Sequence, residues 1–325
     1  MSEEVLASIQ NAPVAWELRE LPPPFLTHDQ YWKLTPEERK LRAEAIEKID
    51  RHSGSIPASS ELKIYEALQP PLYYWLLSIP YQLSKNASLL ERVFLLRYIS
   101  LLIASLIVPL IFLVTLRVIR RQEIAWMATA LFVALPEMMI NVCRIGNECI
   151  GVLIFSAVIL IALDFSVNSF SRRHAVLLGA LLGLGLLTKA YFLTPVPALG
   201  LIYCWKLWKE SEKRKWLQYA CLTFGIAVLI SGWWYVRNKI ISGTWTGLNE
   251  SLMLKDIPLS GLISGVLAVD WRNAFDSILV SHIWFGAWSS LTVRSWMYHV
   301  IFFLIGIAVL GVILVWVRNS EFRSP

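Results

Sequence analysis

Long apolar runs recur along most of the chain and constrain its fold more than any other feature. They cover approximately residues 94–116, 123–142, 148–167, 175–190, 191–207, 216–236 and 297–317. An α-helix needs about 20 apolar residues to cross a hydrocarbon layer roughly 30 Å thick. In lipid, a helix also satisfies its backbone polar groups within one segment. The sequence therefore predicts an all-α integral membrane protein, a bundle of about seven spanning helices.

The composition agrees with a membrane location and argues against a nucleic-acid partner. Apolar residues make up 56% of the 325 residues and charged residues only 17%. A soluble domain of this size with so few polar residues could not cover its apolar side chains with polar surface. The net charge is +6, but the basic residues lie in short clusters at the ends of apolar runs. These clusters form no continuous basic patch that could bind nucleic acid, so no nucleic-acid partner is expected. Their positions indicate membrane topology instead, and membrane lipid is expected to surround the chain.

The charge pattern predicts an orientation. Residues 1–68 carry twelve acids and eight bases. If they lie outside, every basic cluster falls on the inside, as the positive-inside rule requires. We therefore expect a multi-pass protein of the cell inner (plasma) membrane with its N-terminal region on the non-cytoplasmic side. The internal loops are then marked by Arg117, Arg120, Arg121, Arg172, Arg173, Lys206, Lys209, Lys213, Arg214, Lys215 and Arg318.

Two parts of the chain are expected to face different surroundings. Residues 1–68 form an external region with an amphipathic helix, and residues 69–325 form the transmembrane bundle. The bundle includes an outer loop over 237–296, of which the aromatic segment 276–292 is expected to be interfacial. The external helix is predicted from about 36 to 51, because a capping hydroxyl, a proline and a glutamate suit its start.

Polar residues before the first apolar run form one candidate group. Glu66 and Gln69 precede Pro70-Pro71, and Tyr73 opens the short aromatic helix that these prolines are expected to start. A membrane-surface anchor would explain the prolines and the rings. It would not explain a carboxylate and an amide directly before them.

A charged turn between two predicted spans forms a second candidate group. Arg144, Asn147 and Glu148 lie in this turn, on the side predicted to be external. Glu148 begins a helix, where the dipole favours a negative charge. Helix capping alone would account for the acid, and Arg144 would then be its structural partner.

Two cations complete the external set. Lys189 lies where the two shortest predicted spans meet, and Arg237 follows a Trp-Trp-Tyr-Val stretch at a helix end. Short spans leave an indentation at the membrane surface, and a cation at its rim suits a lipid phosphate. Alternatively, the two short spans form a kinked pair packed tightly on its neighbours, and the two cationic side chains extend to water.

The cysteines indicate packing more than chemistry. Cys143, Cys149, Cys204 and Cys221 lie in or beside apolar segments without a CxxC pair. We interpret them as small apolar fillers, and a Cys143–Cys149 disulfide on the outer face is the alternative. No metal-ligating residues are named from the sequence.

The order of these motifs resembles a known family. A Pro-Pro-Leu-Tyr-Tyr helix, the Asn147-Glu148 turn, a Leu-Thr-Lys junction and a Trp-Tyr-x-Arg-Asn helix end follow one another over about residues 60–317. This order is similar to that of the C-superfamily membrane glycosyltransferases, in particular the protein mannosyltransferase and aminoarabinose transferase branch. Each motif is weak alone, and the specificity comes from their order and predicted sidedness.

The resemblance implies a reaction and roles for residues. Such enzymes transfer a hexosyl or pentosyl group from a polyprenyl-phosphate carrier to an acceptor on the outer face. Glu148 matches the second external acid of the family, and Gln69 stands where relatives often carry a basic residue. From position and charge, Lys189 and Arg237 are expected to hold the leaving phosphate, while Glu66, Tyr73, Arg144 and Asn147 complete the candidate site.

One departure from the family concerns its main acidic motif. Relatives begin with a spanning helix and an acidic motif in the first external loop, and this chain shows neither before its paired prolines. Asp29 is the acid that could substitute. The expectation is therefore a transferase, or an incomplete or inactive fragment of one.

The runner-up is a non-enzymatic membrane component of a polysaccharide transport or assembly system. An enzyme needs an acid and a phosphate-binding cation at one outward cavity, whereas a partner protein needs neither. The sequence leaves open the sugar, the acceptor and the need for a divalent metal.

Overall fold

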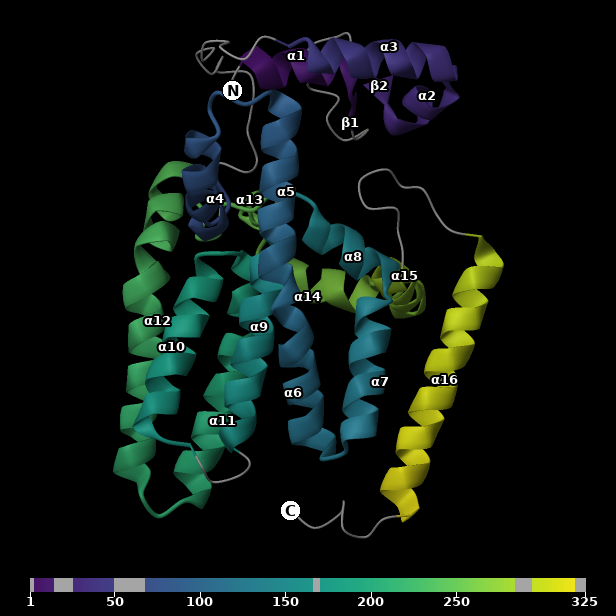
Figure 1. Cartoon of the computed structure of the whole chain (residues 1–325). Coiled ribbons are helices and arrows are strands. Elements are labelled where there is room, and N and C mark those ends of the chain that lie inside the picture. The colour runs from purple at the N-terminus through teal and green to yellow at the C-terminus, as the bar shows by residue number, and fades with distance from the viewer. Residues whose placement is uncertain (1–2, 15–25, 50–67, 166–169, 284–293, 319–325) are drawn as a thin grey trace.

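The computed structural model describes residues 3–14, 26–49, 68–165, 170–283 and 294–318. Helices dominate this part of the chain, and most of them run side by side as a bundle (Figure 1). The bundle contains α5 (Leu89–Ser105), α6 (Ile107–Ile119), α7 (Gln122–Val133), α9 (Glu148–Ala162), α10 (Arg172–Leu186), α11 (Pro195–Lys209) and α12 (Lys213–Ser242).

Among the residues that the structure describes, three helices are long and apolar enough to cross a membrane. They are Leu89–Ile119, which joins α5 to α6, Glu148–Phe165 and Lys213–Ser242. A fourth span results if α7 and the following α8 (Pro136–Cys143) are counted as one bent unit. The all-α membrane class is thus confirmed, but the count of seven spans is not.

Helix length explains the difference for two of the predicted spans, α10 and α11. α10 and α11 have 15 residues each, and at 1.5 Å per residue such a helix is about 22 Å long, shorter than the hydrocarbon layer. The short 3-10 helix η4 (Ala190–Leu193) and Pro195 separate them. The apolar runs therefore predicted the positions of these two helices correctly. They did not show whether each helix crosses the membrane.

Small residues bring α10 and α12 together. A Cβ added at Gly179 would lie 2.6 Å from the backbone oxygen of Thr223, and one added at Gly183 would lie 2.8 Å from Cβ of Ile230. Glycines four residues apart permit this close approach of helices in membranes. The Thr223 hydroxyl adds a bond across the interface, because it donates to the Ala175 carbonyl at 3.0 Å.

The paired prolines start a helix, as predicted. α4 (Leu72–Leu83) begins directly after Pro71, which serves as its N-cap residue. Its first amide, at Leu72, donates to the Leu187 carbonyl at 2.9 Å, and Trp75 stacks on Trp233 with ring centroids 5.7 Å apart. α4 is therefore fixed to α10 and α12 at one end of the bundle.

The N-terminal residues form a separate layer at the same end of the bundle (Figure 1). It contains α1 (Glu3–Asn11), α2 (His28–Lys33), α3 (Pro36–Glu47) and a two-residue parallel pairing of β1 (Pro13–Val14) with β2 (Leu26–Thr27). The predicted start of α3 is confirmed, since Thr35 and Glu38 form a reciprocal capping box. The helix ends at Glu47, four residues before the predicted end.

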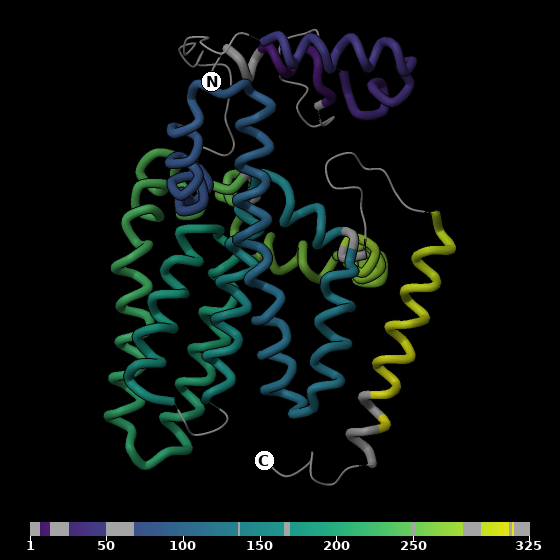
Figure 2. Tube along the Cα trace, in the orientation of Figure 1, coloured from purple at the N-terminus to yellow at the C-terminus, as the bar shows by residue number. Residues whose placement is uncertain are grey.

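The segment after α12 is more helical than the expected outer loop. α12 continues to Ser242 and ends at Gly243, whose φ of 78° suits glycine. Next come α13 (Asn249–Leu254), α14 (Leu259–Ala268) and α15 (Trp271–Ile283), and α16 (Ser295–Arg318) follows. Figure 2 shows the trace of α14 running across the direction of the bundle helices. Most of the segment predicted to be interfacial, 276–292, lies outside the described residues.

Candidate active site

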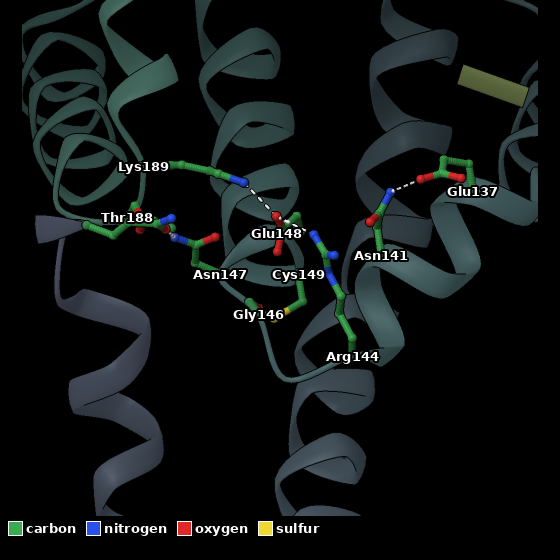
Figure 3. A network of polar contacts seen from close by, with 10 residues as sticks. Glu137, Asn141, Arg144, Gly146, Asn147, Glu148, Cys149, Thr188 and Lys189 are labelled. Carbon is green, nitrogen blue, oxygen red and sulfur yellow. Dashed lines mark hydrogen bonds and ion pairs between the residues drawn. The ribbon is translucent and has the colours of Figure 1, made fainter. Parts of the chain in front are cut away.

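Glu148 is at the centre of a cluster of charged side chains. It is the first residue of α9, where its carboxylate faces the positive end of the helix dipole. Its Oε1 accepts hydrogen bonds from Lys189 Nζ at 2.6 Å and from Arg144 Nη2 at 2.7 Å. Figure 3 shows the two cations approaching this carboxylate from opposite sides. Three residues predicted from the sequence thus meet in space.

The cluster brings two cations to one carboxylate. Arg144 and Lys189 both form ion pairs with Glu148 Oε1. The side chains of Arg144, Glu148 and Lys189 are 25%, 19% and 29% exposed. They are therefore partly shielded from water, which strengthens their electrostatics, but a ligand can still reach them.

Gly146 provides the space for the second carboxylate oxygen. A Cβ at this position would lie 2.5 Å from Glu148 Oε2 and 3.4 Å from Arg144 Nε. The charged side chains therefore pack directly over the backbone of the turn. Glycine at this position permits that contact, and no positive φ is involved.

Asn147 links the turn to two other parts of the chain. It is only 3% exposed, and its Nδ2 donates to Gln69 Oε1 at 3.0 Å and to the Thr188 carbonyl at 2.9 Å. Gln69 and Asn147, both predicted as site residues, are thus in direct contact. The carbonyl of Thr188 immediately precedes Lys189, so the same bond helps to position that lysine.

Three consecutive carbonyls at the end of α10 are each bound by a different element. The Tyr235 hydroxyl of α12 donates to Leu186 O at 3.0 Å. The amide of Leu72 bonds Leu187 O, and Asn147 bonds Thr188 O. The last carbonyls of a helix have no partner within the helix. These hydrogen bonds connect α4, the start of α9 and α12 to the three residues before Lys189.

Arg237 lies outside the Glu148 cluster but is connected to it. Its guanidinium carbon is 4.4 Å from the centroid of the Trp234 ring, and Nη1 donates to Asn238 Oδ1 at 3.0 Å. Asn238 is fully buried and donates to the Leu68 carbonyl at 3.1 Å. Leu68 adjoins Gln69, which contacts Asn147. A path of hydrogen bonds and adjacent residues therefore runs from Arg237 to Glu148.

Tyr73 has a structural position. It is fully buried, and its hydroxyl is hydrogen-bonded to that of Ser100 at 2.7 Å. Burial raises the pKa of Tyr73 to about 12, so the hydroxyl stays protonated. The side chain offers no exposed surface to a ligand, and the prediction that it binds substrate directly does not agree with this burial.

Of the other two predicted acids, the structure describes Asp29 alone, and it is not in the cluster. Asp29 is exposed on α2, in the layer beyond the end of the bundle (Figure 1). Glu66 lies outside the described residues. In the described part of the chain, no group of three or more His, Cys, Asp or Glu side chains could hold a metal ion.

An apolar hollow of about 300 Å³ lies beside the charged cluster. It is lined by Val152, Phe155, Ser156, Tyr191 and Thr194. Val152 is one helical turn beyond Glu148 on α9, and the Tyr191 ring centroid is 5.8 Å from Lys189 Nζ. The hollow therefore adjoins the charged groups through Tyr191.

Three residues that support the site were missed as individual candidates. Thr188 and Tyr235 act through the end of α10, and Asn238 acts through Leu68. Their signal in the sequence is a polar residue within two positions of a predicted site residue, where the helical pattern would bury it. Buried polar groups of this kind are costly unless they are hydrogen-bonded, which makes them indicative of a fixed local structure.

The fold and the cluster define a helical membrane protein in which a carboxylate contacts two cations at one end of the bundle. The family model described as dolichyl-phosphate-mannose-protein mannosyltransferase matches residues 62–243, and all of the contacts around Glu148 lie in this range. Because the match covers more than half of the chain, the chain belongs to this family of membrane glycosyltransferases. The resemblance seen in the sequence is thus confirmed. Comparisons with curated proteins and with solved structures give no match.

Proposed function

We propose that the chain transfers a sugar from a polyprenyl-phosphate carrier to an acceptor at the non-cytoplasmic face of the cell inner membrane. Family membership supports sugar transfer from a lipid-linked donor. The observation that carries the proposal is the contact of Glu148 with both Lys189 and Arg144. It combines an acid with two cations at one accessible place.

The cations are assigned to the carrier phosphate. Charged hydrogen bonds to phosphate are strong, and the guanidinium and ammonium groups offer several donors each. Lys189 and Arg144 are close enough to act on the same anion, since both contact one oxygen of Glu148. Arg237 is the candidate for a second contact to the donor, at the other end of the hydrogen-bonded path.

Donor binding would then change the basicity of Glu148. A carboxylate that accepts from two cations is a weak base, because both partners stabilise its charged form. A phosphate that takes over Lys189 and Arg144 removes part of this stabilisation. The carboxylate is then better able to accept a proton when the donor is present than when it is absent.

The reaction follows from this arrangement. The acceptor hydroxyl oxygen bonds to the anomeric carbon while the bond from that carbon to the phosphate oxygen breaks, with inversion. The electron pair leaves with the polyprenyl phosphate, where the cations stabilise the developing charge. The hydroxyl proton passes to a carboxylate, for which Glu148 is the main candidate and Glu66 the second. Asp29, exposed on α2, is the least favoured.

The apolar hollow suits the first isoprenyl units of the carrier. Its lining is mainly aromatic and aliphatic, and it adjoins the charged cluster through Tyr191. A lipid-linked donor needs this combination, because the phosphate is charged and the chain attached to it is not. The sidedness rests on the basic clusters of the α6–α7 and α11–α12 turns, which lie at the opposite end of the bundle (Figure 1).

The test is a transfer assay in proteoliposomes. Polyprenyl-phosphate sugars that carry a radiolabelled hexose or pentose are supplied with a membrane extract as the acceptor source. We expect label to move to the acceptor with the unaltered chain, and Glu148→Gln and Lys189→Ala to reduce the rate at least about 100-fold.

Matched variants separate the site from general charge effects. Lys85→Ala removes an exposed lysine from the α4–α5 turn, and Glu37→Gln removes an exposed acid from α3. Both should transfer at the rate of the unaltered chain. Full transfer by Glu148→Gln and Lys189→Ala would exclude this site. Binding of the labelled donor without any transfer would favour a non-enzymatic component instead.

A further inference from the structure

A second hollow lies at the end of the bundle opposite the Glu148 cluster. It has a volume of about 410 Å³ and is lined by Leu113, Leu116, Arg117, Arg120 and Leu160. Three of these residues belong to the last turns of α6, Arg120 is the C-cap residue of that helix, and Leu160 belongs to α9. The end of α6 leads into the α6–α7 turn, at the end of the bundle away from α4 (Figure 1). It is therefore distinct from the proposed transfer site.

The lining divides into an apolar and a cationic part. Leu113, Leu116 and Leu160 supply aliphatic surface, and the guanidinium groups come from Arg117 and Arg120 at the α6 end. In a membrane, a groove of this kind faces acyl chains on one side and phosphate groups on the other. Basic pockets between spanning helices bind anionic lipid headgroups for this reason.

Arg120 has an unusual backbone conformation. Its φ is 57°, and in the described part of the chain it is the one residue other than glycine with a positive φ. Glycine or asparagine would adopt this conformation at the end of a helix with less strain. A long cationic side chain at such a position indicates that the charge itself has a role.

The charges around the hollow leave Arg120 unbalanced. Arg117 pairs with Asp164, whose other oxygen is 3.4 Å from His174 Nε2, and Arg121 lies 3.7 Å from Glu123. Within the residues that the structure describes, the Arg120 guanidinium has no ion pair or hydrogen bond. One surplus positive charge therefore remains at the hollow, which matches the single negative charge of a phosphodiester.

We propose that this hollow is a binding site for an anionic glycerophospholipid of the leaflet opposite the transfer site, with Arg120 on the phosphodiester and the three leucines on the acyl chains. Arg117, held by Asp164, supplies a second donor in a fixed orientation. The site is independent of sugar transfer. It also gives the strained conformation of Arg120 a physical reason.

The test is titration of the detergent-purified chain with dioleoyl phosphatidylglycerol, with bound lipid counted by native mass spectrometry. Arg120→Asn removes the charge but keeps a residue that tolerates a positive φ, so the fold should be retained. We expect its affinity for phosphatidylglycerol to fall about fivefold, as for loss of one basic contact at a membrane surface. Leu160→Trp fills the hollow without a charge change and should also lower the affinity.

Arg173→Gln is the matched control, because Arg173 is exposed at the same end but does not line the hollow. It should bind phosphatidylglycerol as the unaltered chain does. Equal losses in Arg120→Asn and Arg173→Gln would show general charge attraction and overturn the proposal. Equal binding of dioleoyl phosphatidylcholine, or displacement of the lipid by inorganic phosphate alone, would overturn it too.

Discussion

At the scale of single residues, the Glu148 cluster depends on the contact of one carboxylate oxygen with two cations. Lys189 and Arg144 both donate to Oε1, while Oε2 lies over Gly146. The geometry is sensitive on the side of Gly146, because the carboxylate packs against the backbone of the turn. A small added group there would move the acid without disturbing a helix.

Gly146→Ala tests this sensitivity. The added methyl group would meet Glu148 Oε2 at 2.5 Å, which is the end of a flexible side chain, so the carboxylate must turn away while the fold is kept. We expect the transfer rate to fall about tenfold or more, since small misplacements of catalytic groups are costly, with an unchanged melting temperature in detergent. An unchanged rate would show that the position of Oε2 is unimportant.

The residues of this cluster were predictable from the sequence to different degrees. Glu148, Arg144 and Lys189 stand out because few charged residues lie at those ends of the apolar runs that are predicted to be external. Asn238 was not predicted, because its role depends on the Leu68 carbonyl, 170 residues away. Local patterns contain no signal for such a distant partner.

At the scale of helices, the capture of the α10 end is the main structural feature. Carbonyls of Leu186, Leu187 and Thr188 are bound by Tyr235, Leu72 and Asn147 respectively. This arrangement explains how a short helix that ends within the bundle avoids unsatisfied backbone groups in an apolar setting. It also places Lys189 at a defined height beside α9.

Tyr235→Phe removes one of these three bonds and nothing else. The Leu186 carbonyl then lacks its hydroxyl donor, and we expect a loss of about 0.5–1.5 kcal/mol in the free energy of unfolding. The transfer rate should fall as well, because Lys189 is less firmly placed. Tyr98→Phe, at an exposed tyrosine of α5, should change neither quantity. A Tyr235→Phe chain as stable as the unaltered one would argue against a supporting role for this bond.

Gly179→Ala tests the close packing of α10 on α12. Its Cβ would lie 2.6 Å from the Thr223 backbone oxygen, so the helices must separate, at an expected cost of about 1–3 kcal/mol in unfolding free energy. Gly225→Ala on α12 is the control, because a Cβ there meets nothing within 4 Å. Thermal unfolding in detergent should show a lower melting temperature for the first variant alone. Equal stability of the two would contradict the packing described.

At the scale of the whole molecule, the sequence predicted the class of the fold better than its number of spans. Apolar runs report which segments avoid water, and α5–α6, α9 and α12 follow them closely. The same runs do not report where a helix breaks. α7 and α8 meet at an angle of 68°, and α10 and α11 each end after 15 residues. The segment between α12 and α15 was expected to be a loop, because it contains several glycines and its apolar stretches are short. The structure has α13 and α14 there.

The predicted orientation can be tested by cysteine labelling in intact cells. In a chain whose four cysteines are replaced by alanine, Lys85→Cys places a single thiol in the exposed α4–α5 turn, and Arg214→Cys places one at the exposed start of α12, at the opposite end of the bundle. A membrane-impermeant maleimide should label Lys85→Cys in intact cells and Arg214→Cys after permeabilisation alone. The reverse pattern would place the Glu148 cluster on the cytoplasmic side.

The most direct test of the account is a double-mutant cycle between Glu148 and Lys189. The two side chains meet at 2.6 Å and are proposed to act on one donor phosphate and one acceptor proton. Initial rates of sugar transfer would be measured for the unaltered chain, Glu148→Gln, Lys189→Ala and the double variant. Residues that act as a unit give non-additive losses, so the double variant should be no slower than the slower single variant. Single variants that keep full activity, or losses that multiply in the double variant, would contradict the account.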